Sequence, residues 1–240
     1  NISTRIDFTL NSDTIFLNLI NFSLYLYILK SGQMKEFKTI EDTQTDEAKE
    51  PVIDYNKVYT YGDYLKLEID EMVEIIRGKL LRMSPAPRIK HQSVSGNIFA
   101  YLHQNLRGKN CKVYSAPIDV VLPINNKKRT KSTTVVQPDI CVICNPKIIE
   151  EKAVFGVPDF VIEIVAGKDV KRDTQYKYSV YEEAGVGEYW IVFGEMRFVE
   201  VFILENGKYQ RLNAFSEDDI IPVKTLPGLS ISIDDIFEGV

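Results

Sequence analysis

The residues best suited to chemistry are two carboxylates and one lysine in the second half of the chain. Glu163 lies inside the apolar run Phe160–Val165, which predicts a buried strand. A carboxylate in such a strand is costly to desolvate unless a cation or several donors meet it. Asp139 lies in a second strand-like run, Val135–Ile143, and Lys177 follows the first run. Two strand carboxylates and a lysine are the groups needed to hold a divalent cation against a phosphodiester.

The spacing of these residues decides which elements must carry them. The segment Asp173–Tyr181 predicts the start of a helix in which every fourth residue shares one face. If this helix packs back over the strand end, Lys177 can reach Glu163. Asp159 competes with Asp139, but four strand residues separate it from Glu163, about 13 Å in an extended chain. That separation is too long for one ion, so we expect Asp139 to supply the second carboxylate from a separate strand.

The chemistry expected of this group is metal-assisted hydrolysis. Mg²⁺ or Mn²⁺ would suit Asp139, Glu163 and the backbone carbonyl of Ile164, because hard cations prefer oxygen ligands. The ion would polarise a phosphoryl oxygen and activate a bound water. Lys177 would hold that water or stabilise negative charge in the transition state. The alternative interpretation is a structural ion pair between Glu163 and Lys177.

Other polar residues are candidates for accessory roles. Glu74 lies in the first strand of a hairpin predicted around Arg77–Gly78, where it is either an exposed strand residue or a third acidic group of the site. His91 and Gln92 lie in the first turn of the helix predicted over 89–106. They are either surface or helix-capping residues, or contacts to a phosphate. The basic loop 125–131 is either a solvated turn or a grip on a phosphate backbone; its cations are Lys127, Lys128, Arg129 and Lys131.

Several further elements are predicted from the pattern of apolar residues and turns. A short helix is expected over 60–67, with its cap near Thr60. Asn206-Gly207 is a strong hairpin signal between two alternating runs. The strands expected beyond those already named are 113–122, 188–193, 198–204 and 208–212.

Composition limits the classes of protein that the chain can represent. The 240 residues carry a net charge of −5, so general basicity does not mark a nucleic-acid binder, although a local basic groove stays possible on an acidic protein. Three cysteines and two histidines argue against a disulfide scaffold and indicate a reducing compartment. Cys141 and Cys144 point to opposite faces of a strand, which disfavours a shared zinc. We therefore expect a cytoplasmic protein.

The first 57 residues differ from the rest and are predicted to form an irregular extension before a domain over 58–240. Their apolar run, Ile15–Leu29, is shorter than the ~20 residues that span a bilayer and contains two asparagines. It also lacks the basic start and cleavage site of a signal peptide. We expect the native protein to begin at Met34, with a core helix or a membrane anchor as the alternatives, and we expect no membrane partner.

A family resemblance rests on two stretches of sequence. VQPDICVI and, after it, GVPDFVIEIVAGKDVKRDTQYKYSVYEEAGVGEYWIV resemble the Uma-two-type restriction endonucleases, a bacterial family of the PD-(D/E)XK nuclease superfamily. The upstream VEIIRGKLLRMSPAPRIKHQSVSGNI and the closing LPGLSISIDDIF are similar to it as well. The resemblance covers about 59–237 and implies an α/β (α+β) fold, a restriction-endonuclease-like mixed central sheet flanked by helices, with extra N- and C-terminal β-hairpins.

The resemblance also implies roles for single residues. Asp139 and Glu163 match the metal ligands, and Glu74 matches the acidic residue of an early strand. The superfamily usually places its lysine two residues after the glutamate, where this chain has Val165, so the resemblance implies that Lys177 replaces it. Position 166 is alanine where serine is common.

The implied activity is Mg²⁺-dependent cleavage of DNA by a homodimer. Two alternatives stay open on the sequence. One is a non-catalytic nucleic-acid-binding or regulatory module that retains the nuclease fold. The other is a sugar hydrolase that uses the carboxylates as an acid/base pair.

Overall fold

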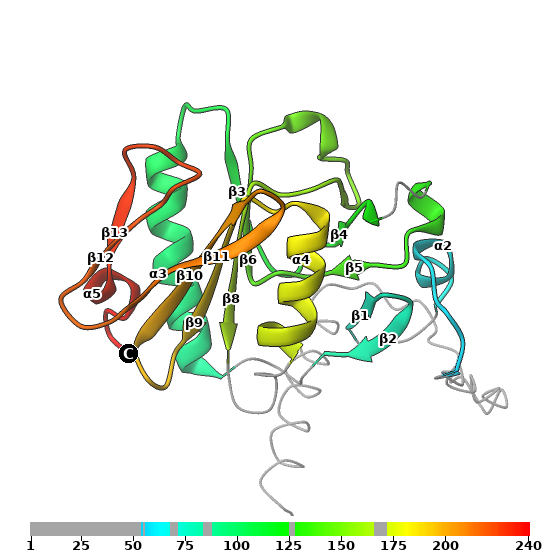
Figure 1. The fold of residues 1–240 in the computed structure, drawn as a ribbon, viewed down its shortest axis with the longest axis horizontal. Helices are drawn as coiled ribbons and strands as arrows, with labels where there is room; N and C mark the ends of the chain where they lie inside the picture. Colours follow the sequence, from blue (N-terminus) through cyan, green and yellow to red (C-terminus); the bar gives the residue numbers. More distant parts are fainter. Residues whose placement is uncertain (1–53, 55, 68–71, 84–87, 125–127, 166–171) are drawn as a thin grey trace, which may run out of the picture. The chain divides into compact units, whose positions relative to one another are not determined.

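The computed structural model describes residues 54, 56–67, 72–83, 88–124, 128–165 and 172–240 (Figure 1). The sequence before residue 54, including Met34 and the apolar run 15–29, lies outside the described residues. Of the described helices, none is long and apolar enough to cross a membrane. The α+β fold with mixed sheets agrees with the predicted fold class.

The larger sheet has six strands, and the apolar run that contains Glu163 lies in the middle of it. The strands pair antiparallel except for β8 and β9, which are parallel. All six residues of β8 are buried, as expected of a strand covered on both faces. In spatial order the strands are β11 (Lys208–Phe215), β10 (Phe198–Glu205), β9 (Glu188–Phe193), β8 (Phe160–Val165), β6 (Ile140–Ile143) and β3 (Lys112–Ser115).

A smaller five-stranded sheet is built around the predicted N-terminal hairpin. The turn at Arg77–Gly78 joins its first two strands. Both turn residues have positive φ, as a tight hairpin turn requires. In spatial order the strands are β2 (Lys79–Arg82), β1 (Val73–Ile76), β5 (Val135–Val136), β4 (Val120–Val121) and β7 (Val154–Phe155). A short helix, α2 (Tyr61–Tyr64), precedes this sheet and is capped by Thr60, as the sequence predicts.

Two helices cover opposite faces of the six-stranded sheet (Figure 1). The first, α3 (Ile89–Leu106), spans the predicted range. Its buried residues recur every four positions and pack on one face of β6 and β8; they are Val94, Ile98, Leu102 and Leu106. The second, α4 (Tyr178–Ala184), continues a π-helical turn at Arg172–Lys177 and packs on the other face.

Prolines divide two runs that the sequence predicts as single strands. The run Val135–Ile143 splits into β5 and β6, which belong to different sheets, on either side of Pro138. The run 113–122 likewise splits into β3 and β4 around Pro117. Proline has no N–H to give to a ladder, so each run leaves one sheet there and enters the other.

The chain ends in a third small sheet and a helix that pack on α3. The strands β12 (Ile220–Pro222) and β13 (Ser230–Ser232) pair antiparallel, and α5 (Ile233–Ile236) follows directly. The antiparallel pair β12–β13 agrees with the C-terminal β-hairpin that the family resemblance implies. Asn97 of α3 donates hydrogen bonds to the backbone oxygens of Ile236 and Glu238, which fixes this end of the chain.

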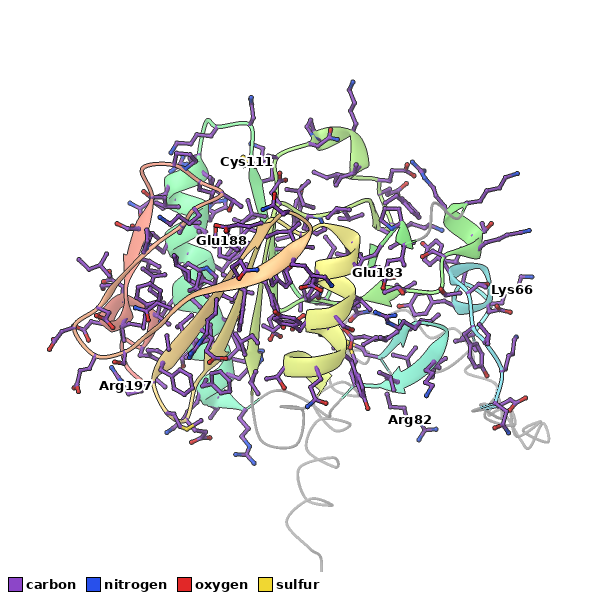
Figure 2. All side chains as sticks on the ribbon, viewed as in Figure 1. Lys66, Arg82, Cys111, Glu183, Glu188 and Arg197 are labelled. Atoms are coloured by element: carbon purple, nitrogen blue, oxygen red, sulfur yellow. A yellow bond between two sulfur atoms is a disulfide. The ribbon has the colours of Figure 1, made fainter. Side chains whose placement is uncertain are left out.

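A disulfide joins Cys111 and Cys144, which the sequence did not predict. The register of β3 and β6 pairs Lys112 with Ile143, so the next position outward places the two cysteines opposite each other. Figure 2 labels Cys111 beside the start of β3. The third cysteine, Cys141, is a buried thiol.

Candidate active site

The centre of the site is the buried ammonium of Lys177. Its Nζ lies 2.9 Å from Oε1 of Glu74 and 3.0 Å from Oε1 of Glu163. The hydroxyl of Tyr181 donates a 2.7 Å hydrogen bond to the same oxygen of Glu163. All four side chains are buried. The strand carboxylate is therefore met by a cation and a donor, as its burial requires.

These side chains come from four separate elements. Glu74 belongs to β1 of the smaller sheet, and Glu163 belongs to β8 of the larger one. Lys177 is the last residue of the π-helical turn, and Tyr181 lies one turn further along, in α4. Their spacing of four places both on the helix face that packs over β8. The predicted approach of this helix to the strand end is what the structure shows.

An ion pair on the surface supports the approach of β1 to α4. Arg77, in the turn between β1 and β2, lies 2.8 Å from a carboxylate oxygen of Glu183 on α4. Figure 2 labels Glu183 beside this helix. The pair is partly exposed, so its contribution to stability is small, and it links the hairpin that carries Glu74 to α4.

The environment keeps Tyr181 in its protonated, donating form. Burial, followed by the charge of Glu163, raises the pKa of the Tyr181 phenol well above its usual range. The same carboxylate contributes, after burial, to raising the pKa of the Cys141 thiol to about 12. The phenol therefore remains a hydrogen-bond donor to Glu163 at any physiological pH.

Asp139 lies directly before β6 and is held by backbone as well as side-chain groups. Its Oδ2 accepts a 2.7 Å hydrogen bond from the N–H of Ile164 and lies 3.2 Å from Nε2 of His91. The side chain of Asp139 is 20% exposed, in contrast to the buried glutamates. Asp139 is thus the carboxylate of the site that solvent can reach most easily.

The strand register brings Asp139 and Glu163 to the same end of the larger sheet. Ile140 pairs with Ile162 across β6 and β8, so the next position places Asp139 opposite Glu163. Residues opposite each other in an antiparallel pair have closely spaced Cβ atoms. Asp159, by contrast, lies at the other end of β8, where it accepts a 2.6 Å hydrogen bond from the N–H of Cys144. The preference for Asp139 over Asp159 agrees with these positions.

Asp139 and Glu163 are the carboxylates at this end of the sheet that a hard divalent cation could share. In the described part of the chain, no group of three or more His, Cys, Asp or Glu side chains is assembled to hold a metal ion. Mg²⁺ often binds through one or two carboxylates and keeps several waters, so Asp139 and Glu163 are the pair to test as its ligands. The N–H of Ile164 points to Asp139, and in an extended strand the carbonyl of the same residue faces the same neighbour.

Glu74 is not an exposed strand residue. Its side chain is fully buried, and its Oε1 accepts a 2.8 Å hydrogen bond from the N–H of Gln137 in addition to the contact with Lys177. The alternative of an outward-facing glutamate is therefore wrong. The reason is that β1 lies inside the smaller sheet, between β2 and β5, and all four of its residues are buried.

The residues predicted to contact nucleic acid are spread over two regions. His91 contacts Asp139 from the first turn of α3, while Gln92 beside it is exposed. The described part of the basic loop is exposed and forms a 3₁₀ turn at Arg129–Lys131 next to α2. Arg129 pairs with Glu150 and lies over the ring of Phe155, so it is committed elsewhere. Lys128 and Lys131 are exposed without contacts to the carboxylates among the described residues, and Lys127 lies outside them.

Two residues of this region were not assigned a role from the sequence. Tyr181 donates to Glu163, and its spacing of four from Lys177 was the available signal. The backbone N–H of Gln137 donates a hydrogen bond to Glu74, and no sequence pattern marks a backbone donor. Both act on the carboxylates, so the site extends beyond the residues that spacing selects.

Comparisons with known proteins agree with this architecture. Residues 61–234 match the family model Uma2, described as "Putative restriction endonuclease". Among solved structures, the crystal structure of "a putative nuclease belonging to DUF820 from Anabaena variabilis ATCC 29413" is similar, with a TM-score of 0.59 and 20% sequence identity. The similarity covers 74% of this chain and 97% of that one and shows a shared fold. No curated protein sequence matches the chain. Because the family match extends over 61–234 of the 240 residues, the chain belongs to the Uma2 family.

Proposed function

We propose that this chain is a metal-dependent endonuclease that hydrolyses phosphodiester bonds in DNA. Membership of a family described as restriction endonucleases supports a nuclease function. The single observation that carries the proposal is the contact of Lys177 with Glu74 and Glu163, next to Asp139 at the same end of the sheet. This contact puts an ammonium beside Glu163, one of the two carboxylates that we propose as cation ligands.

Asp139 and Glu163 are the residues that would hold Mg²⁺ or Mn²⁺, together with the carbonyl of Ile164 and water. When bound, such an ion polarises a phosphoryl oxygen and lowers the pKa of a coordinated water. The chain fixes both carboxylates in advance: the N–H of Ile164 holds one, and Lys177 and Tyr181 hold the other. Carboxylates that are already oriented need little reorganisation when a cation and a substrate arrive.

In this proposal Lys177 acts on the substrate, and Glu74 positions Lys177. Two carboxylates stabilise its ammonium in a buried site, where a fixed positive charge is effective against developing negative charge. We assign Lys177 to orienting the attacking water or stabilising the phosphorane-like transition state. Tyr181 is a positioning residue, because it touches Glu163 rather than the substrate.

The experiment is a cleavage assay on the full chain and on a matched variant. Purified protein is incubated with supercoiled plasmid and with linear DNA, in Mg²⁺ or Mn²⁺, with and without EDTA. We expect nicked or linear product only with the metal. Glu163→Gln keeps the size and the hydrogen-bonding geometry of the side chain and removes its charge, so it should lower the rate by at least about a hundredfold.

The outcomes separate the proposal from its alternatives. Cleavage that persists in Glu163→Gln at the original rate would assign the activity to a contaminant or to another site. DNA binding that is indifferent to EDTA and leaves no product would identify a non-catalytic binding module. A parallel RNA substrate shows whether the nucleic acid is DNA, because equal cleavage of both would widen the substrate class.

A further inference from the structure

Two exposed cations lie directly before the residue of α3 that contacts Asp139. Arg88 immediately precedes this helix, and Lys90 is its second residue. Their side chains are 73% and 61% exposed. His91, the next residue, is only 13% exposed and places its Nε2 3.2 Å from Oδ2 of Asp139. A short stretch of chain therefore joins a candidate metal ligand to positive charge on the surface.

The turn between β9 and β10 faces these two cations. Glu195 in this turn places Oε1 3.6 Å from an Nη of Arg88 and Oε2 3.9 Å from Nζ of Lys90. The turn follows Phe193, which pairs with Val165 at the end of β8. Figure 1 shows the start of α3, this turn and the end of β8 near one another at the lower side of the view. The cations and the candidate active site thus lie at the same end of the larger sheet.

The two contacts of Glu195 are loose. Both distances are longer than a hydrogen bond to a carboxylate. Other exposed ion pairs on this sheet are closer, at 2.6 Å for Arg211 with Glu200 and 2.8 Å for Lys208 with Glu182. An exposed pair of such length contributes little to stability, so a stronger acceptor can replace the carboxylate of Glu195.

A phosphate is an acceptor that suits this pair of cations. A guanidinium binds a phosphate through two parallel hydrogen bonds, and an ammonium binds it as a point charge. Arg88 and Lys90 direct one group of each kind toward the carboxylate of Glu195. Two positive side chains meet one negative side chain there, so this place keeps a positive charge on a chain whose net charge is −5.

We propose that Arg88 and Lys90 bind a backbone phosphate of the DNA strand close to the phosphate that is cleaved. Glu195 keeps the two side chains in place until this phosphate replaces it. The proposal rests on the proposed nuclease function, because it names the surface by which the chain holds its substrate. Successive phosphates of one strand lie ~3.4 Å apart along the duplex axis. A strand whose scissile phosphate lies at Asp139 therefore has neighbouring phosphates within reach of both cations.

The first test is the salt dependence of DNA binding. A fluorescein-labelled duplex is titrated with the full chain in EDTA, which prevents metal-dependent cleavage, over a series of NaCl concentrations, and fluorescence anisotropy reports binding. Arg88→Gln/Lys90→Gln should weaken binding and reduce the slope of log K against log[NaCl] by about one, as expected for one lost phosphate contact. The control Lys208→Gln/Arg211→Gln removes the same charge from β11 and should leave the slope unchanged.

The second test removes the competing carboxylate. Glu195→Gln should tighten DNA binding by about threefold, because an exposed ion pair no longer opposes the phosphate. The control Glu200→Gln, which removes the partner of Arg211, should have little effect. In the plasmid assay with Mg²⁺, Arg88→Gln/Lys90→Gln should raise KM and leave kcat nearly unchanged, since a phosphate away from the reacting bond is bound equally before and during the reaction. Thermal melts check that each variant folds.

Each other outcome decides against the proposal or against the parent function. An unchanged slope in Arg88→Gln/Lys90→Gln would overturn the proposal, and an equal loss in Lys208→Gln/Arg211→Gln would replace it with general electrostatic attraction. Equal tightening by Glu195→Gln and Glu200→Gln would overturn the role of Glu195. DNA binding that depends on Arg88 and Lys90, without cleavage by the unmodified chain, would remove the nuclease function alone. Metal-dependent cleavage with an unchanged KM in Arg88→Gln/Lys90→Gln would remove the phosphate contact alone.

Discussion

The carboxylate of Asp139 accepts a 2.7 Å hydrogen bond from the backbone N–H of Ile164. This bond continues the contact between β6 and β8 beyond the last backbone pair, Ile140 with Ile162. A side chain thus takes the place of a backbone acceptor at the end of the ladder. Asp139 is consequently oriented by the sheet itself.

The first prediction separates the charge of Asp139 from its hydrogen bond. Asp139→Asn keeps an acceptor for Ile164, so the thermal midpoint should change little, but a neutral amide is a poor ligand and cleavage should be lost. Asp139→Ala also removes the acceptor and should cost about 1 kcal/mol more, because the site is partly open to water. Thermal melts and the plasmid assay measure the two effects. Full cleavage by Asp139→Asn would exclude a metal role for this residue.

The second prediction concerns the buried charges around Lys177. Lys177→Met leaves Glu74 and Glu163 buried without their shared cation, which should destabilise the fold by about 3–5 kcal/mol. The neutral triple variant Glu74→Gln/Glu163→Gln/Lys177→Met removes all three charges and should recover most of that loss. Urea denaturation gives both free energies of unfolding. Neither variant should cleave DNA. Equal free energies of unfolding for Lys177→Met and the triple variant would show that the ammonium has no structural role.

The third prediction uses the chemical state of the three cysteines. Burial and the nearby Glu163 raise the pKa of Cys141 to about 12, and only a thiolate reacts quickly with iodoacetamide. At pH 8.5 the folded protein should therefore gain no label. Unfolding in urea should add one label at Cys141, and urea with reductant should add three, because Cys111 and Cys144 are joined. Mass spectrometry counts the labels, and labelling of the folded protein would contradict the buried placement.

The fourth prediction compares two glycines with open space around them. Gly96 lies in the interior of α3 with no atom within 4 Å of an added Cβ, so Gly96→Ala should stabilise the protein by about 1 kcal/mol. Gly185 ends α4 with φ of 94°, so Gly185→Ala should destabilise it by roughly 1–2 kcal/mol through backbone strain alone. Thermal melts should show shifts of opposite sign. Equal signs would contradict one of the two backbone assignments.

Elements with a strong local pattern could be predicted from the sequence. The bounds of α3, β8 and β9 agree with the predicted ranges because their apolar residues follow a clear period and end at marked breaks. The meeting of Glu163 with Lys177 also followed from local spacing. The family resemblance is confirmed by the family match and the similar nuclease structure, whereas the roles of the site residues stay predictions.

Features that depend on long-range register could not be predicted. The burial of Glu74 results from the pairing of β1 with β5, which are separated by nearly sixty residues and read as independent strands. The Cys111–Cys144 bond likewise depends on the pairing of β3 with β6. The prolines at 117 and 138 were visible, but nothing local shows that each run changes sheets there. Local periodicity identifies single helices and strands, whereas the pairing of strands depends on contacts between distant parts of the chain.

The contact of Lys177 with both glutamates has a consequence for partial unfolding. Glu74 belongs to the five-stranded sheet and Glu163 to the six-stranded one, so one ammonium spans both. Detachment of the hairpin 73–82 would withdraw one of its two counter-charges while the larger sheet stayed intact. On gentle heating, we therefore expect DNA cleavage to be lost at a lower temperature than most of the β-structure. The cause would be detachment of the hairpin 73–82 before the larger sheet unfolds.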